Sequence, residues 1–174
     1  MINSEELLLV VDENNNPIKP LPRKQVHSEG HWHRTAHIFI VDGKENILCQ
    51  QRSMKKDQNP GKWEPFFGGH LLSNHTYFEN AIIELREELG INADKKNLTE
   101  YLIHKNHKSK EFTQVFVYTW IGKIEDLVIE KDEVEKILLL PISEVIKHYI
   151  PNNDIMWTQI GYEGDLLDIL LKQR

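Results

Sequence analysis

The sequence has little of several features that mark particular classes of protein. It contains one cysteine, Cys49, among 174 residues, so the chain cannot form an intramolecular disulfide. Its apolar runs fall far short of the roughly 20 residues that a membrane-spanning helix needs. Residues 1–16 show neither a basic start nor a signal-peptide cleavage pattern. From these absences we expect a soluble, cytoplasmic protein with no membrane partner.

Positive charge is also scarce. The chain has 21 Lys and Arg residues against 27 Asp and Glu residues, a net charge of -6 with neutral histidines. A protein that binds a nucleic acid polymer usually presents a basic face to the phosphates, so this balance argues against that class of partner. A small anionic ligand stays open, because a few local cations or a bound metal ion can hold it.

What the chain does contain is typical of a globular protein. Hydrophobic residues make up 40% and charged residues 28%, a balance that argues against disorder. No internal repeat or low-complexity linker divides the sequence. Since 174 residues suffice for one substantial core, we expect a single domain over residues 1–174.

Strand-like and helix-like patterns alternate along this chain. β-Rich runs cover Ala36–Val41, Ile47–Gln51 and residues 112–122. Helical patterns cover residues 76–90, 141–150 and 163–174. The alternation predicts an α/β or α+β domain, of which α/β is the expected fold class.

The helix predicted at residues 76–90 carries an unusual group of acids. At roughly 100° per residue, one apolar stripe faces the core: Phe78, Ala81, Ile82, Leu85 and Leu89. Glu84, Glu87 and Glu88 fall together on one flank, where their charges repel each other and oppose the helix dipole. Most such groups are solvated acidic faces, but clustered carboxylates also form binding sites for Mg²⁺ or Mn²⁺.

The segment GGHLLSNHTYFENAIIELREELGI, residues 68–91, resembles the Nudix box. When the motif is aligned from Gly90 backwards, these residues match in type and spacing: Gly69, Glu84, Leu85, Glu87, Glu88, Gly90 and Ile91. The resemblance implies a Nudix-type α/β/α sandwich around a mixed β-sheet. It also implies that Glu84, Glu87 and Glu88 bind Mg²⁺ or Mn²⁺ against the diphosphate of a small-molecule substrate, with Glu87 in a catalytic role.

Two positions depart from the Nudix box. His75 stands where the motif has its first glutamate, and Ile83 stands where it has an arginine. That arginine would lie one turn before Glu87 and orient it. Glu79 and Arg86 lie on the same side of the helix and are the candidate substitute pair.

A wider resemblance covers the chain from about Leu8 to about Trp157. The segments VDENNNPI, RKQVHSEGHWHRTAHIFIV, ILCQQRSMKKDQNPGKW and GGH resemble the Nudix branch that contains type I isopentenyl diphosphate isomerase and its hydrolase-like relatives. The resemblance implies further metal ligands at four positions: His27, His33, His70 and Glu111. It implies that Arg52 and Lys56 bind the diphosphate, and that Glu111 is a second catalytic candidate. Each of these side chains also has a plain alternative as a structural histidine or a solvated charge.

The isomerase resemblance is incomplete at its thiol. The position of the isomerase cysteine is Gly68, and Cys49 lies in a strand elsewhere, where it is typical of a small buried hydrophobic residue. The first hypothesis is therefore a Nudix hydrolase that cleaves a nucleoside or prenyl diphosphate. The alternatives are an isomerase-like enzyme or a catalytically weakened diphosphate-binding protein. The sequence does not identify the substrate or decide between a monomer and a homodimer.

Overall fold

The computed structural model describes residues 6–149 and 154–171. The strands are β1 (Leu7–Val11), β2 (Pro17–Pro22), β3 (His33–Val41), β4 (Asn46–Arg52), β5 (Trp63–Glu64), β6 (Leu98–Asn106), β7 (Glu111–Thr119) and β8 (Val134–Pro141). The α-helices are α1 (Arg23–Glu29), α2 (Tyr77–Leu89), α3 (Ile142–Tyr149) and α4 (Glu163–Leu171). None of the helices described here has both the length and the apolar character needed to cross a membrane.

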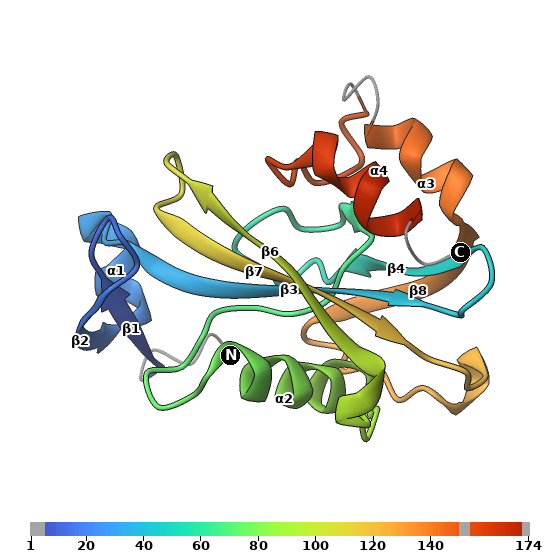
Figure 1. Cartoon of the computed structure of the whole chain (residues 1–174), viewed down its shortest axis with the longest axis horizontal. Helices are drawn as coiled ribbons and strands as arrows, with labels where there is room; N and C mark the ends of the chain where they lie inside the picture. Colours follow the sequence, from blue (N-terminus) through green and yellow to red (C-terminus); the bar gives the residue numbers. More distant parts are fainter. Residues whose placement is uncertain (1–5, 150–153, 172–174) are drawn as a thin grey trace.

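The main sheet is mixed and has the strand order β5-β4-β3-β7-β6, with β8 paired to β4. β3 and β7 run parallel over their whole lengths, whereas the other pairs are antiparallel. Figure 1 shows α2 on one face of this sheet, and α3 with α4 on the other. This arrangement confirms the predicted α/β/α sandwich around a mixed sheet.

The two faces of the sheet bury alternate residues of β3, as the two-residue period of a strand requires. Ile38 and Ile40 pack in one hydrophobic cluster with Leu85 of α2. Phe39 and Val41 pack in the other cluster, which also contains the following residues of α3 and α4: Val145, Leu166, Ile169 and Leu170. The alternation therefore decides which side of the sheet each polar residue of β3 faces.

The first half of β3 pairs with a segment that is not one of the named strands. β3 meets β4 at two positions only, Ile40 opposite Leu48 and Val41 opposite Ile47. Closer to the N-terminal end of β3, Ile38 N–H donates to Phe67 O at 2.8 Å, and Ala36 N–H donates to Gly69 O at 2.9 Å. Residues 67–71 are thus held along β3, and they include the glycine pair and the histidine at the start of the Nudix-box segment.

A small antiparallel sheet of β1 and β2 packs with α1 at one end of the main sheet (Figure 1). Leu8, Val10 and Val26 form its core, and Leu21 and Leu72 pack against them. This unit positions Arg23 at the start of α1, and His27 one turn further along the same helix.

Candidate functional site

The helix α2 has strong local signals at both ends. Thr76 and Glu79 form a capping box, in which each side chain accepts a hydrogen bond from the other residue's backbone N–H. Gly90 ends the helix with a left-handed φ of 70°. The carboxylate of Glu79 is engaged in the cap, and no ion pair between Glu79 and Arg86 occurs in the described structure. These two residues therefore do not form the substitute pair that the sequence suggested.

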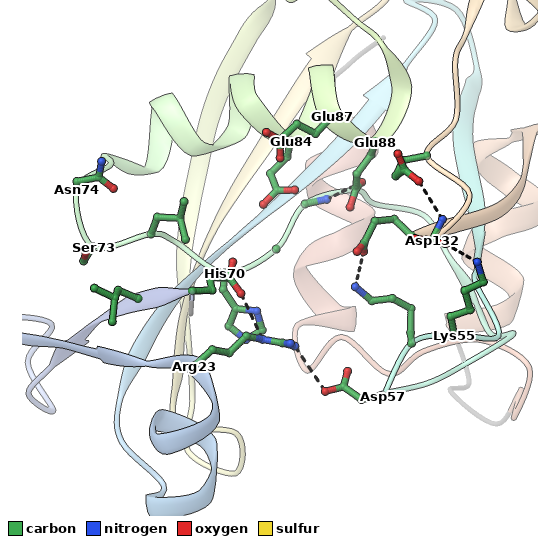
Figure 2. Close-up of a pocket in the computed structure, with 18 residues that line it drawn as sticks. Arg23, Lys55, Asp57, His70, Ser73, Asn74, Glu84, Glu87, Glu88 and Asp132 are labelled. Atoms are coloured by element: carbon green, nitrogen blue, oxygen red, sulfur yellow. Dashed lines mark hydrogen bonds and ion pairs between the residues drawn. The ribbon is translucent and has the colours of Figure 1, made fainter. Parts of the chain in front are cut away.

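A cavity of about 970 Å³ lies between α2, the segment after Phe67, the start of α1 and two loops. Glu84, Glu87 and Glu88 line it, together with Gly68, Gly69 and His70. Figure 2 shows the carboxylates of Glu84 and Glu88 projecting from α2 into this space, with Arg23 and His70 across from them. The cavity therefore brings the Nudix-box glutamates together with residues from distant parts of the chain.

Two of these glutamates lie next to each other on α2, Glu88 buried and Glu84 half-buried. Glu88 is 5% exposed, and its Oε2 accepts a hydrogen bond from Gly68 N–H at 3.2 Å. Burial, followed by repulsion from Glu84, raises the pKa of Glu88 well above its ordinary range. Burial, followed by repulsion from Glu87, raises the pKa of Glu84 to about 8. A positive charge placed between these carboxylates would relieve both costs.

Side chains at the two glycines opposite the glutamates would crowd their neighbours, more severely at Gly68 than at Gly69. A Cβ atom on Gly69 would lie 3.0 Å from Oε1 of Glu84. A Cβ atom on Gly68, whose φ is +119°, would lie 2.2 Å from the carbonyl oxygen of Ala36. The position that corresponds to the isomerase cysteine thus requires glycine in this backbone. Cys49 is fully buried in the core, so it supplies no thiol to the site.

Three histidines form a second group of potential metal ligands. His27, His33 and His70 each offer a ring nitrogen, and these atoms lie within 4.8 Å of one another. His33 Nδ1 donates to the carbonyl of His31 at 2.9 Å, which leaves its Nε2 with a free lone pair. That Nε2 is buried and has no hydrogen bond, and Glu111 Oε1 lies 3.5 Å away.

The protonation of this histidine group also suits a metal. Burial lowers the pKa of His70 well below its ordinary value and lowers that of His27 as well, which favours the neutral form of both rings. His27 Nε2 and His70 Nε2 lie 3.0 Å apart and share a hydrogen bond. Three imidazoles and one carboxylate are a donor set that Zn²⁺ and other transition metals bind.

Glu111 lies apart from the glutamates of α2, although the histidine group adjoins them through His70. Glu111 opens β7 opposite His33, and alternation along β7 places it on the same face of the sheet as Val115, away from α2. Glu111 is accordingly absent from the lining of the cavity, whereas His70 belongs to both places. The structure therefore separates Glu111 from the box glutamates and groups it with the histidines.

The two cations predicted to bind phosphate lie in different surroundings. Lys56 lines the cavity, where it forms an ion pair with Glu133. Arg52 is not among the lining residues, and its Nη1 pairs at 3.0 Å with Glu64, a carboxylate that is 2% exposed. Burial raises the pKa of Glu64, while Arg52 opposes that rise.

Several residues of the cavity were not predicted from the sequence. Arg23 lines it, and its buried Nε has no hydrogen bond; its ion-pair distances to Glu6 and Asp57 are both 3.7 Å. The acidic run EKDE at residues 130–133 contributes three more carboxylates. Eight acidic and three basic side chains line the cavity, an excess of five negative charges when all are ionised. The only sequence signal was this acidic run before a β-rich segment.

Similarity to known proteins extends over most of the chain. The NUDIX domain family model matches residues 31–158. An uncharacterized Nudix hydrolase of Clostridium acetobutylicum is 33% identical over 153 residues, covering 82% of this chain and 73% of that protein. Isopentenyl-diphosphate Delta-isomerase 2 of Photorhabdus laumondii is 28% identical over 131 residues, covering 75% of this chain and 74% of that protein.

The fold also matches solved structures. A crystal structure of a Deinococcus radiodurans protein superposes with a TM-score of 0.71 at 17% identity, covering 96% of this chain and 98% of that one. At this identity the match concerns the fold alone. The family model spans most of the sequence, and the two relatives named above are similar over at least three quarters of the chain. The chain belongs to the Nudix family of enzymes, in the branch that includes Nudix hydrolases and isopentenyl-diphosphate isomerases.

Proposed function

We propose that this protein hydrolyses a diphosphate linkage in a small organic diphosphate of the nucleoside or prenyl class, using Mg²⁺ or Mn²⁺ bound by Glu84, Glu87 and Glu88. The observation that supports this best is the gathering of three carboxylates in one cavity, two of them with raised pKa values. Clustered carboxylate oxygens are the ligands that both ions prefer. When bound, the ion neutralises phosphate charge and lowers the pKa of the attacking water.

The residues of the chain divide the remaining work among themselves. Gly68 N–H orients Glu88 at 3.2 Å, and Asn80 Nδ2 donates to Glu84 at 3.3 Å. Glu87, which is exposed to the cavity, accepts a proton from the attacking water. The oxygen of that water forms a bond to phosphorus, and the P–O bond to the bridging oxygen breaks, so that the bridging oxygen leaves with the other product. Lys56 and Arg23 also line the cavity, where their N–H groups can meet the phosphate oxygens.

The direct test is an assay of the purified protein with Mn²⁺ or Mg²⁺. The substrates are nucleotide sugars, NADH, dinucleoside polyphosphates and prenyl diphosphates, and the readout is released phosphate or monophosphate. We expect hydrolysis of at least one substrate, with a loss of about 100-fold or more in Glu87→Gln. If wild type and Glu87→Gln are equally inactive on the whole panel, the protein is not a hydrolase of these compounds.

The histidine group favours a second candidate, an isomerase-like reaction on an isoprenoid diphosphate. His27, His33, His70 and Glu111 offer a metal site of the kind that the isomerase resemblance implies. Such a reaction moves a proton at carbon, and Gly68 leaves this chain without the usual thiol. Incubation of isopentenyl diphosphate with the protein in D₂O, followed by NMR, decides the matter, because the absence of deuterium uptake rules this candidate out.

The departures at His75 and Ile83 support a third candidate, a weakened protein that binds a diphosphate without cleaving it. Ile83 is half-buried on α2 and offers Glu87 no charged partner. Titration of the protein with Mn²⁺ separates this case from the first. Binding that is lost in Glu88→Ala, without turnover of any substrate in the panel, would favour the third candidate over hydrolysis.

A further inference from the structure

We propose that the hairpin between β6 and β7 carries a separate anion-binding site, formed by Lys105 and Lys110 over the ring of Trp32, which takes a phosphate group. None of these three residues lines the glutamate cavity. The proposal is therefore independent of the proposed hydrolytic function. Figure 1 shows the hairpin at the end of the main sheet where β1, β2 and α1 pack.

This hairpin concentrates positive charge in an acidic chain. Residues 104–110, with the sequence HKNHKSK, contain three lysines, two histidines and no acidic residue, whereas the whole chain has a net charge of -6. Lys108 is exposed, and Lys105 and Lys110 are half-buried. A local group of cations attracts anions even where the protein as a whole is negative. The hairpin thus has the charge that an anionic ligand requires.

Two of the lysines are gathered at one aromatic ring. Lys105 Nζ and Lys110 Nζ each lie 4.8 Å from the centre of the Trp32 ring. Lys105 Nζ also lies 5.4 Å from the centre of the Phe112 ring. The electron-rich face of an aromatic ring attracts an ammonium group, so Trp32 holds two positive charges that repel each other. An anion bound beside them would remove this repulsion.

Neither of these ammonium groups forms an ion pair with any residue that the structure describes. Lys105 Nζ donates to the backbone carbonyl of Glu13, a neutral acceptor that holds the side chain in place. Asp12 interacts electrostatically with Lys105, but its own Oδ1 accepts a hydrogen bond from Asn16 N–H at 2.9 Å. An ammonium group carries three N–H donors, so both lysines keep donors for a ligand.

The ring itself offers a further donor. Trp32 is 6% exposed, and its Nε1 is buried and makes no hydrogen bond within the described structure. A buried donor without a partner is rare and costs free energy. An oxygen of a ligand admitted beside the ring would supply the missing acceptor. Because lysine has a flexible four-carbon stem, Lys105 and Lys110 can admit such a ligand without a change in the backbone.

These donors suit a phosphate group better than a carboxylate. A phosphate group carries a charge between about -1.5 and -2 at pH 7 and has three strong acceptor oxygens. Two ammonium groups match that charge, and the three oxygens can accept from both lysines and from the indole N–H at once. Free phosphate and a phosphomonoester share this chemistry, so both are used as probes.

The experiment is a titration of the ¹⁵N-labelled full chain, followed by NMR of its indole N–H groups. EDTA and a constant ionic strength exclude binding through a metal ion or through general screening. The chain has four tryptophans, and the indole signal that is missing from Trp32→Phe belongs to Trp32. We expect inorganic phosphate or glycerol 2-phosphate to shift this signal saturably, with a dissociation constant on the order of 1 mM. The other three indoles are internal controls.

Lysine variants test the site itself. Lys105→Gln and Lys110→Gln should each weaken phosphate binding by about tenfold, because each removes a charge-assisted hydrogen bond. Lys108→Gln is the matched control, since it removes the same charge from an exposed position of the same hairpin that does not lie over the ring. Because this charge is solvated, we expect Lys108→Gln to weaken binding by less than about twofold.

Two outcomes overturn the proposal. If neither probe shifts the Trp32 signal, the lysines only pack on the ring. If Lys108→Gln weakens binding as much as Lys110→Gln does, the hairpin attracts anions without a defined site. Saturable binding of either probe supports the site, and the tighter probe shows whether free phosphate or a phosphomonoester is preferred. If Trp32→Phe does not fold, replacing each of the other tryptophans in turn identifies the Trp32 signal by elimination.

Discussion

The backbone N–H of Gly68 donates a hydrogen bond to Oε2 of Glu88 across 3.2 Å, and so joins the two ends of the Nudix box. The same glycine presses against β3, since a Cβ atom there would come within 2.2 Å of the Ala36 carbonyl oxygen. One residue without a side chain thereby fixes the distance between α2 and the segment that continues to His70. Two consequences of this contact can be measured.

Gly68→Ala should destabilise the protein strongly. The φ of +119° strains any residue other than glycine, and the new methyl group would collide with backbone that cannot move aside. We expect the free energy of unfolding to fall by about 3 kcal/mol or more, measured by urea denaturation. Gly30→Ala is the control, because its φ of +69° is also left-handed but its Cβ would meet nothing within 4 Å. A loss of about 1 kcal/mol or less in both variants would contradict the steric argument.

The same contact predicts that restoring the missing thiol does not restore an isomerase. In Gly68→Cys the side chain would have to occupy the space of the Ala36 carbonyl, so the segment must shift and take Glu88 and His70 with it. We expect no deuterium uptake into isopentenyl diphosphate by this variant. Measurable uptake, with wild type inactive, would show that the backbone adapts to a cysteine after all.

The raised pKa of Glu84 should make the stability of the metal-free protein fall as the pH rises. The pKa of Glu84 is about 8 in the folded state, against an ordinary value of 4.5. Without metal, the folded state therefore keeps this proton in a pH range where the unfolded state has lost it. Stability is highest below the unfolded pKa and falls as pH rises through the folded pKa.

The measurement is urea denaturation at about pH 5.5 and about pH 8, with EDTA or with Mn²⁺. In EDTA we expect a fall of about 1 kcal/mol or more between these values, and a smaller fall in Glu84→Gln. Saturating Mn²⁺ should reverse the trend, because the ion binds the deprotonated carboxylates. Glu125→Gln, at an exposed site elsewhere, should behave like wild type. Equal stability in EDTA at both pH values would contradict the burial of the Glu84 carboxylate.

The parts of the molecule that the sequence predicted are those set by local patterns. The predicted helix at residues 76–90 is α2, Tyr77–Leu89, because its apolar period, its cap at Thr76 and its stop at Gly90 are all local. The alternating strand and helix patterns predicted only an α/β or α+β domain, whereas the α/β/α sandwich was implied by the resemblance to the Nudix box. β6 and β8 were not predicted; β6 has a mixed exposure pattern, and β8 alternates poorly along its length.

The site depends more on contacts between distant residues, which no local pattern reveals. Glu111 is 78 residues from His33, and the parallel register of β3 with β7 brings them together on the face away from α2. Lys56 and Glu133 are 77 positions apart in the sequence, yet they form an ion pair at the cavity. A family motif can identify single residues of such a site, but only the folded structure shows which of them lie together.

The histidine group should bind a transition metal independently of the glutamates. We expect Co²⁺ to produce visible absorption bands, since three imidazoles and a carboxylate make a low-coordinate site. His70→Ala should abolish the bands, whereas His75→Ala, which alters a histidine outside the group, should keep them. Glu88→Gln should also keep them if the two sites are separate. Bands that survive in His70→Ala would place the ion elsewhere.

Arg52 should contribute to stability more than to phosphate binding. Its guanidinium pairs at 3.0 Å with the buried carboxylate of Glu64, and it also donates to the Gln58 carbonyl. Arg52→Met leaves Glu64 buried without its partner, which typically costs about 3 kcal/mol. Glu64→Gln in the same chain removes the stranded charge, so the double variant should recover part of that loss. Lys56→Gln should instead keep its stability and raise the KM for a diphosphate substrate. If Arg52→Met unfolds like wild type in urea and raises KM alone, Arg52 binds phosphate as the family resemblance implied.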